Sequence, residues 1–468
     1  MINEKPPSGD SYDVLIAGGG PAGAATALAL KRRDAGLRVA LVEKSDYAAR
    51  RIGESLSPPA QLLLTKLGVW ETFLSRGPLE SSGTRAAWGS GVFHENEFIY
   101  SPFGRGWHLD RRDFDAMLAD EAERAGVTVF RNTTAVPGEC TGGWSVRLRE
   151  AGSEREVRAR FVVDATGRRS VFAKSRGARH EIFDQLVAIV VFVRFAAEDR
   201  RADTYTSIEA CERGWWYSAA LPNGDMAVIF MTDADMLRGM RWRTVQEWRA
   251  LSALAPQTAR RIAAGMPQGE PLLRPAGSQR LDRFAGEDWL AVGDAAGTRD
   301  PLSSQGIMKG LQSGLDAARA IGLHLGGNAG ALAAYDRSAA RDYTQYLDGR
   351  AAYYGLEQRW PEAVFWRRRH EVITLHPEEC LRSGPANGVA GYLKFATRLT
   401  ETELQAIAEG CVQPLPARRI LTGFKTHTNP ARSDREVLLA MQAMLAGGML
   451  RKCPRRPDGD SKWRGPQP

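Results

Sequence analysis

The stretch that most constrains this chain is residues 12–43, YDVLIAGGGPAGAATALALKRRDAGLRVALVE. An apolar run is followed by Gly18, Gly20 and Gly23 in G-x-G-x-x-G register, an alanine-rich segment and a second apolar run that ends at Glu43. This order predicts a strand, a tight turn, a helix, a second strand and an acid. Together they make the βαβ unit that binds dinucleotides. The alternative is a structural turn in some other α/β domain.

Each residue of the turn has a predicted task. Gly18 allows the tight turn, Gly20 lets the backbone approach a pyrophosphate, and Gly23 lets the helix pack closely on the strand. The helix start, which includes Ala22, presents free N–H groups to the anion. Glu43, with Lys44 beside it, stands where a carboxylate can accept both ribose hydroxyls, which favours FAD or NAD over NADP.

The length of the chain, 468 residues, predicts a protein of two or three domains. Its net charge is +8. Its five cysteines are scattered and form no C-x-x-C. Neither a disulfide framework nor a zinc site is expected, and a reducing cytoplasm fits best. The longest apolar run, Leu186–Val193, is too short to span a bilayer. We therefore expect no membrane contact, no nucleic-acid partner and no metal.

Two further landmarks follow along the chain. The segment 159–170, ARFVVDATGRRS, predicts a buried strand that ends at Asp164, and the segment 288–310, DWLAVGDAAGTRDPLSSQGIMKG, predicts a strand with Asp294 in the turn behind it. Between them, short β-like runs indicate an inserted sheet domain. The predicted organisation is a nucleotide domain at 10–180 and 281–353, a sheet domain at 181–280 to which 84–100 contributes, and a C-terminal extension at 354–468.

Together and in this order, the three motifs resemble the flavin-dependent monooxygenase superfamily, which has the para-hydroxybenzoate hydroxylase fold. The resemblance implies an α/β protein with a glutathione-reductase-like, Rossmann-type FAD domain. It also implies an inserted antiparallel β-sheet substrate domain and a helical C-terminal extension with a basic tail. Asp294 is expected at the ribityl chain and the loop 301–307 beside the isoalloxazine ring. The FAD contacts that it implies beyond the first motif are Glu54, Ser55, Arg111, Asp164, Asp294, Pro301, Gly306 and Ile307.

Within the superfamily, RIGESLSP and DPLSSQGI resemble the tryptophan-halogenase branch. Those halogenases use a lysine and a glutamate to hold and activate hypohalous acid. Here Ser303 stands at the glutamate position, and no lysine lies between Lys66 and Lys174, where the catalytic one would fall. The resemblance then implies direct hydroxylation of an electron-rich ring by a flavin C4a-hydroperoxide. Oxygen is required, and the reductant is NAD(P)H or a separate electron donor.

The segments GESLSP, GTRAAWGS and GWWYSAALP and the basic extension are similar to maturation flavoproteins of this branch. One member of this group hydroxylates a tryptophan in the small subunit of an amine dehydrogenase during formation of a tryptophylquinone cofactor, and related members mature amino-acid oxidases. The resemblance to the first implies the amine dehydrogenase subunit as the partner here. Two alternatives stay open, a monooxygenase of a small aromatic metabolite and a non-catalytic flavoprotein that acts as a scaffold for a partner chain.

The sequence marks candidate catalytic residues less clearly than it marks the cofactor-binding motifs. Trp216 and Tyr217 could line an aromatic pocket, although neighbouring residues of a strand point to opposite faces and at least one should pack in the core. His108 could act on substrate, whereas a lone histidine beside a strand is more often structural. Ser304 could offer its backbone N–H to the flavin. No strong catalytic base is evident.

Overall fold

The computed structural model describes residues 11–138, 143–196, 203–370, 375–384, 399–446 and 449–453. The chain divides into two compact units, residues 1–359 and 360–468. The helices of the first unit are α1 (Pro21–Arg33), α2 (Ala60–Leu67), α3 (Trp70–Ser75), α4 (Arg111–Arg124), α5 (Val171–Ser175), α6 (Val245–Ser252), α7 (Pro256–Ile262), α8 (Gly306–Leu325) and α9 (Ala331–Gly355). Within the described ranges, every helix is too short or too polar to span a bilayer.

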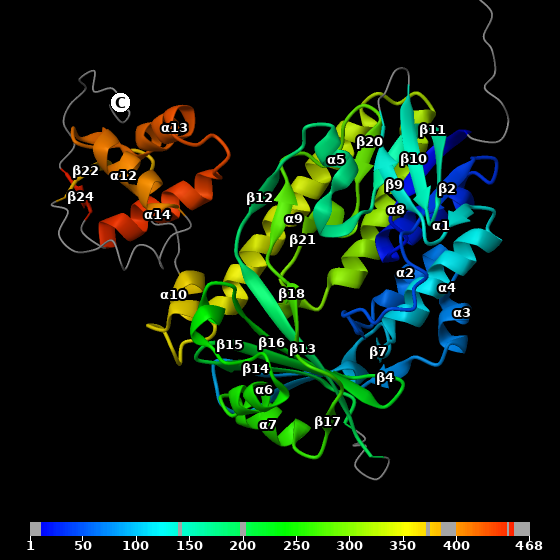
Figure 1. Cartoon of the computed structure of the whole chain (residues 1–468), viewed down its shortest axis with the longest axis horizontal. Coiled ribbons are helices and arrows are strands. Elements are labelled where there is room, and N and C mark those ends of the chain that lie inside the picture. The colour runs from blue at the N-terminus through cyan, green and yellow to red at the C-terminus, as the bar shows by residue number, and fades with distance from the viewer. Residues whose placement is uncertain are drawn as a thin grey trace, which may run out of the picture. The chain divides into compact units, whose positions relative to one another are not determined.

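The first sheet of this unit has a parallel core in the order β8-β2-β1-β11, with β20 beside β11 and β10 and β9 antiparallel at one edge. Its strands are β1 (Ser11–Ala17), β2 (Val39–Val42), β8 (Thr128–Phe130), β9 (Thr134–Pro137), β10 (Trp144–Glu150), β11 (Ser153–Asp164) and β20 (Trp289–Ala291). Helix α1 packs against α4 and α8 (Figure 1). The three sequence motifs follow β1, β11 and β20, and because these strands are parallel, their carboxyl ends meet at one edge of the sheet.

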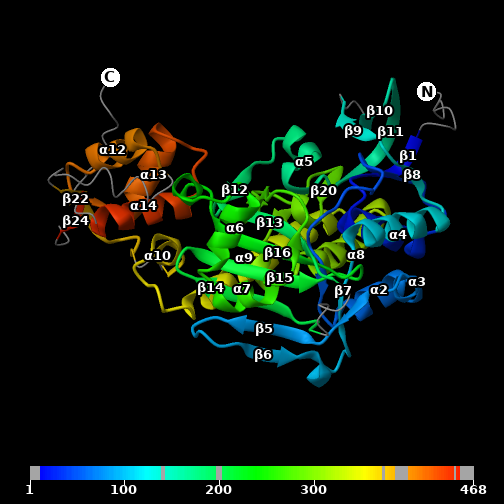
Figure 2. The same cartoon turned by 60° about the horizontal axis from the view of Figure 1, so that its bottom comes forward.

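The second sheet is largely antiparallel, in the order β17-β13-β16-β15-β14-β5-β6, with β18 also paired to β13. Its strands are β5 (Gly83–Ala87), β6 (His94–Glu97), β13 (Leu186–Arg194), β14 (Thr206–Cys211), β15 (Gly214–Ala220), β16 (Asp225–Asp233), β17 (Met266–Pro267) and β18 (Leu272–Pro275). Helices α6 and α7 cover one face, as Figure 2 shows. The opposite face is left for the site.

The first unit also contains two small three-stranded sheets. One has the order β3-β7-β4, from β3 (Ser55–Leu56), β7 (Gly106–His108) and β4 (Leu79–Ser81). The other has the order β12-β19-β21, from β12 (His180–Ile182), β19 (Gln279–Leu281) and β21 (Gly297–Thr298). Pairing of β3 with β7 places Ser55 opposite His108. The α/β FAD-domain fold with an added antiparallel sheet is thus as predicted.

The second unit is mainly helical, as predicted for the extension, with a three-stranded sheet in the order β23-β22-β24 that was not predicted. Its elements are α10 (Val364–His370), α12 (Glu401–Gly410), α13 (Ala417–His427), α14 (Asp434–Ala446), β22 (Cys380–Ser383), β23 (Leu415–Pro416) and β24 (Leu450–Lys452). Leu381, Ile407, Phe424 and Met441 are fully buried in its core. The predicted basic tail after Cys453 lies outside the described residues.

Glu403 of α12 makes the stability of this second unit dependent on pH. Its carboxylate accepts hydrogen bonds from the Thr400 N–H (2.7 Å) and from Arg432 (2.8 and 2.9 Å). Burial opposes its ionisation, but these hydrogen bonds outweigh burial and lower the pKa of Glu403 to about 2. Since the folded pKa lies below the ordinary value, the stabilisation is complete above about pH 4.5 and is lost as pH falls toward 2.

We expect Glu403→Gln to lower the free energy of unfolding at pH 7 by about 1–3 kcal/mol, because the Arg432 guanidinium loses its anionic partner. The difference from wild type should shrink at pH 3. Urea denaturation of the full chain at both pH values measures it. Glu401→Gln, at an exposed position of the same helix, is the matched control. An equal loss at both pH values would contradict the assignment.

Candidate active site

A cavity of about 370 Å³ lies where the three motifs meet the second sheet. Its wall is formed by the first motif, the turn at residues 53–55, α4, the third motif and the strands of the second sheet. Of the predicted residues, those that line it are Gly20, Ala22, Gly23, Glu54, Ser55, Arg111, Tyr217, Asp294, Pro301, Ser304, Gly306 and Ile307. Segments that are far apart in the sequence are thus brought to one site.

The glycines of the first motif differ in what surrounds them. A Cβ on Gly18, which has φ +114°, would stand 2.1 Å from the Ala165 carbonyl oxygen, and one on Gly23 would stand 1.9 Å from the Gly18 carbonyl oxygen. These two positions allow close packing between the turn, β11 and α1. Around Gly20 the space is open, and the residue lines the cavity at the start of α1. This open cradle at a helix N-terminus fits a pyrophosphate.

Glu43 and Lys44 do not line the cavity. The buried Glu43 carboxylate accepts hydrogen bonds from the Gly19 N–H (2.8 Å), from the Ser45 backbone and hydroxyl, and from Arg51 (3.2 Å). Lys44 is exposed. The carboxylate therefore fixes the glycine turn itself, and its contact with a ribose stays a prediction.

Asp164 corrects the sequence analysis, because it does not line the cavity. It is fully buried, and its carboxylate accepts hydrogen bonds from the Thr166, Phe172 and Ala173 backbone N–H groups at 3.0, 2.8 and 2.8 Å. Two of these donors belong to the first turn of α5, which begins soon after β11 ends. Asp164 thus ties α5 to the end of β11, and its predicted contact with FAD is wrong.

We expect Asp164→Ala to lower the free energy of unfolding by about 2–4 kcal/mol, because it leaves several buried N–H groups without an acceptor. Asp164→Asn keeps one acceptor oxygen, so it should lower the free energy of unfolding by less than Asp164→Ala does. Urea denaturation of the two variants checks this order. Equal stability of Asp164→Ala and wild type would contradict the structural role.

Asp294 of the third motif is exposed to the cavity while protein surrounds it on its other sides. Burial raises the pKa of its carboxyl group, and the guanidinium groups of Arg168 and Arg111 oppose that shift. Arg111 itself is held by the Ile52 carbonyl (2.8 Å) and by Asp115 (2.9 and 3.0 Å). An acid between two guanidinium groups is well suited to bind the hydroxyls of a polyol chain.

Arg168 is a site residue that the sequence analysis did not identify, although it stands in the motif DATGRRS. It lines the cavity and donates a hydrogen bond to the Gly277 carbonyl (2.8 Å). Arg299 and Asp300 of the third motif also line the cavity and were not predicted. All three are charged residues inside recognised motifs, and that position was the signal by which they could have been found.

The loop that follows Asp300 forms another wall of the cavity. Asp300 is buried and accepts a hydrogen bond from the Tyr354 hydroxyl (2.7 Å), while its own N–H donates to the Tyr346 hydroxyl (2.6 Å). Ser304 has φ +48°, and Gly306 begins α8. Two tyrosines of α9 thus position the loop that the sequence analysis placed beside the isoalloxazine ring.

A buried network of hydroxyl groups runs from the cavity into the protein. The Tyr217 hydroxyl contacts the Ser55 hydroxyl (2.8 Å), which contacts Thr206 (2.9 Å), which contacts His108 Nε2 (2.9 Å). Burial raises the pKa of Tyr217 and of Glu54, and burial lowers the pKa of His108 to about 3. Tyr217 is therefore protonated and His108 neutral at pH 7, so neither is poised as a strong base.

Trp216 corrects a second prediction. It is fully buried on the opposite face of β15, where it packs on Phe230 and Trp248 with ring centroids 4.9 and 5.9 Å apart. Alternation along the strand sends Tyr217 to the cavity and Trp216 under α6. Trp216 belongs to the core.

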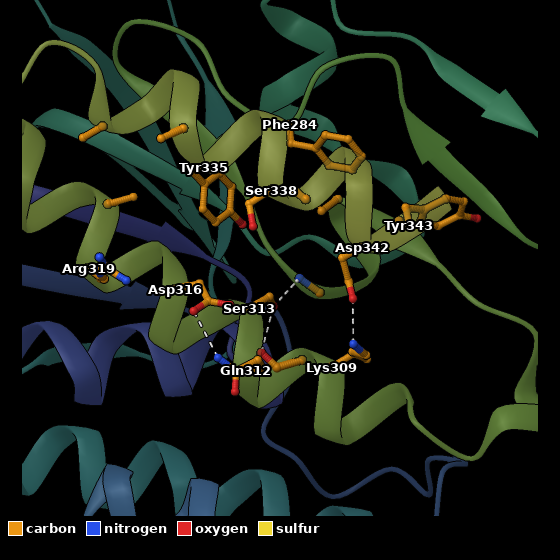
Figure 3. A pocket seen from close by; sticks show the side chains of 18 of the residues that line it. Phe284, Lys309, Gln312, Ser313, Asp316, Arg319, Tyr335, Ser338, Asp342 and Tyr343 are labelled. Carbon is orange, nitrogen blue, oxygen red and sulfur yellow. Dashed lines mark hydrogen bonds and ion pairs between the residues drawn. The ribbon is translucent and has the colours of Figure 1, made fainter. Parts of the chain in front are cut away.

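A second, larger hollow of about 660 Å³ lies between α8 and α9. In Figure 3, Lys309 pairs with Asp342 across the two helices, and Gln312 donates to Asp316 along α8. Gly20, Gly23 and the second sheet take no part in its wall. The smaller cavity, which unites all three motifs, is therefore the candidate site for the cofactor.

A family model described as an FAD binding domain matches residues 11–349. The chain belongs to this FAD-binding-domain family. LodB of Marinomonas mediterranea, whose name assigns it to the FAD-dependent oxidoreductases, is 32% identical over 78% of this chain and 99% of its own. A 1H-pyrrole-2-carbonyl-[peptidyl-carrier protein] brominase of Pseudoalteromonas luteoviolacea is 27% identical over 68% of this chain and 79% of its own.

Among solved structures, the myxobacterial chondrochloren halogenase CndH has the same fold, with a TM-score of 0.70, 23% identity and coverage of 94% of this chain and 99% of that chain. This FAD-binding protein is an oxidoreductase, and its sequence is similar to those of flavin-dependent halogenases. The cavity fits its cofactor, and FAD, when bound, supplies the redox and oxygen chemistry.

Proposed function

We propose that this flavoprotein is a monooxygenase that hydroxylates an aromatic ring. One observation carries the proposal, that no lysine is among the described residues lining the cavity. Halogenation in the branch that this chain resembles depends on a lysine that holds hypohalous acid. Without that amine, hypohalous acid has no group to hold it, and the chemistry that we propose is direct transfer of oxygen to an electron-rich ring.

The cavity also has a wall suited to an aromatic ring. Ala188, Ile229 and Met231 of the second sheet present apolar side chains to it, with the Tyr217 hydroxyl beside them. An apolar wall with a few polar groups excludes water and orients the ring. An indole is electron-rich enough to react without ionisation by a base, which agrees with a neutral His108 and a protonated Tyr217.

The substrate that we propose is a peptidyl tryptophan in the small subunit of an amine dehydrogenase, on the way to a tryptophylquinone cofactor. The choice rests on the similarity of GESLSP, GTRAAWGS and GWWYSAALP to maturation flavoproteins. Oxygen is consumed, and electrons come from NAD(P)H or from a separate donor. A small aromatic metabolite is the alternative substrate.

The test is intact-mass spectrometry of that small subunit after coexpression with the wild-type chain or with Gly20→Val. We expect a mass gain of one or two oxygen atoms, localised to one tryptophan and absent with the variant. A halogen in the product from chloride or bromide medium would overturn the argument from the missing lysine. No gain, despite bound FAD and reductant, would move the assignment to a small aromatic substrate or to a scaffold.

A further inference from the structure

The second unit brings two cysteines from distant parts of the sequence together. Strands β22 and β24 are antiparallel, with Leu381 opposite Lys452. The next pair in this register is Cys380 and Cys453, and the Cys453 N–H donates to the Cys380 carbonyl at 3.0 Å. In such a hydrogen-bonded pair the Cα atoms are about 5.5 Å apart, which lies within the range that a disulfide spans.

The side chains of this pair also meet. The two thiols are within hydrogen-bonding reach of each other, and both side chains are half-buried. Burial, together with the neighbouring Cys380, raises the pKa of Cys453 to about 11. Both positions can therefore be reached by a small oxidant. The fraction of Cys453 thiolate at neutral pH is small, so we expect the reaction to be slow.

A third cysteine lies nearby but is less suited to react. Cys411 is fully buried at the C-terminal end of α12, and burial, with a smaller contribution from Cys453, raises the pKa of its thiol to about 12. Its carbonyl accepts a hydrogen bond from the Ser383 N–H at 2.9 Å. Cys411 is thus fixed in the core, while Cys380 and Cys453 face each other at the end of the sheet.

We propose that Cys380 and Cys453 form a reversible disulfide that fastens β24 to β22 under oxidising conditions. With hydrogen peroxide as the two-electron oxidant, one thiolate attacks a peroxide oxygen, giving a sulfenic acid and a first water. The second thiol then displaces the hydroxyl of the sulfenic acid, forming the S–S bond and a second water. Two thiols and one peroxide thus give one disulfide and two waters.

The disulfide would close a loop of chain that contains α12, α13 and α14. A cross-link of this kind limits the freedom of the unfolded chain and opposes local opening of the strands that it joins. Without it, β24 is held by three residue pairs to β22. The proposal is therefore a redox-dependent lock on the second unit, and it does not depend on the substrate of the first.

The test uses the full-length protein with FAD, either reduced by dithiothreitol or exposed to hydrogen peroxide. Peptide mapping without reductant should find Cys380 linked to Cys453, and the number of titratable thiols in the unfolded chain should fall by two. Hydrogen exchange of β22 and β24, followed by mass spectrometry, should slow about tenfold or more on oxidation. Reduction should restore the faster exchange.

Three single variants complete the test. Cys380→Ser and Cys453→Ser should lose both the linked peptide and the slower exchange, whereas Cys211→Ser, a buried position in the first unit, should keep them. A linked peptide that contains Cys411 would overturn the assigned pair. A sulfinic acid in place of a disulfide, or a disulfide that leaves hydrogen exchange unchanged, would overturn the lock.

Discussion

Gly20→Val should weaken FAD binding by at least about 100-fold, a loss of roughly 3 kcal/mol. The backbone at Gly20 is extended, with φ −72° and ψ −178°, so a valine there causes no strain. Gly20 lines the cavity at the start of α1, and the valine side chain would enter the open space beside it. A pyrophosphate could then no longer approach the N–H groups of the helix. Calorimetric titration of the apoprotein with FAD measures the effect.

The matched control is Gly239→Val, because Gly239 also has open space around it and does not line the cavity. It should keep the affinity of wild type. Valine at Gly18 or Gly23 would instead meet backbone atoms about 2 Å away and disturb folding, so those variants are less informative. If Gly20→Val folds and binds FAD with unchanged affinity, the pyrophosphate does not lie at Gly20.

The parts of the site that the sequence predicts are those encoded in contiguous residues. The glycine turn, the strand before it and the helix after it are determined locally. Asp294 lies in the turn after the buried strand β20, and the loop 301–307 follows within the same contiguous motif. Parallel pairing of β1, β11 and β20 then brings these segments to one edge. The cofactor site could therefore be assembled from motifs before any contact was known.

What could not be predicted depends on pairing between distant segments. Ser55 meets His108 only because β3 pairs with β7, and Tyr217 reaches them from another sheet. The face on which Trp216 lies follows from the register of β15 and from the helices that cover it. The type of side chain alone does not show on which face of a strand a residue lies. Asp164 shows the same limit, since a carboxylate in a recognised motif proved to hold a neighbouring helix.

Tyr217→Phe should reduce the share of consumed reductant that ends in hydroxylated product by about 100-fold, with FAD affinity unchanged. The lost hydroxyl belongs to the part of the hydroxyl network that lines the cavity, where it contacts Ser55 and Glu54. Burial and the nearby Glu54 raise the pKa of Tyr217, so it stays a protonated hydroxyl, held in place by Ser55 and Glu54, and can orient the substrate. Without it, reduced oxygen should leave as hydrogen peroxide. Product and peroxide per NAD(P)H, or per electron pair from the separate donor, measure the loss.

Tyr335→Phe separates this role from simple packing. Tyr335 is also buried, and its hydroxyl donates to the Ala291 carbonyl at 2.7 Å outside the cofactor cavity. Each variant removes one buried hydroxyl group with its hydrogen bonds, so both should lose on the order of 1 kcal/mol of stability. Only Tyr217→Phe should change the ratio of product to peroxide. If the two variants lose similar stability and neither changes that ratio, the hydroxyl network supports the fold alone, and the orientation of the ring must come from the apolar wall.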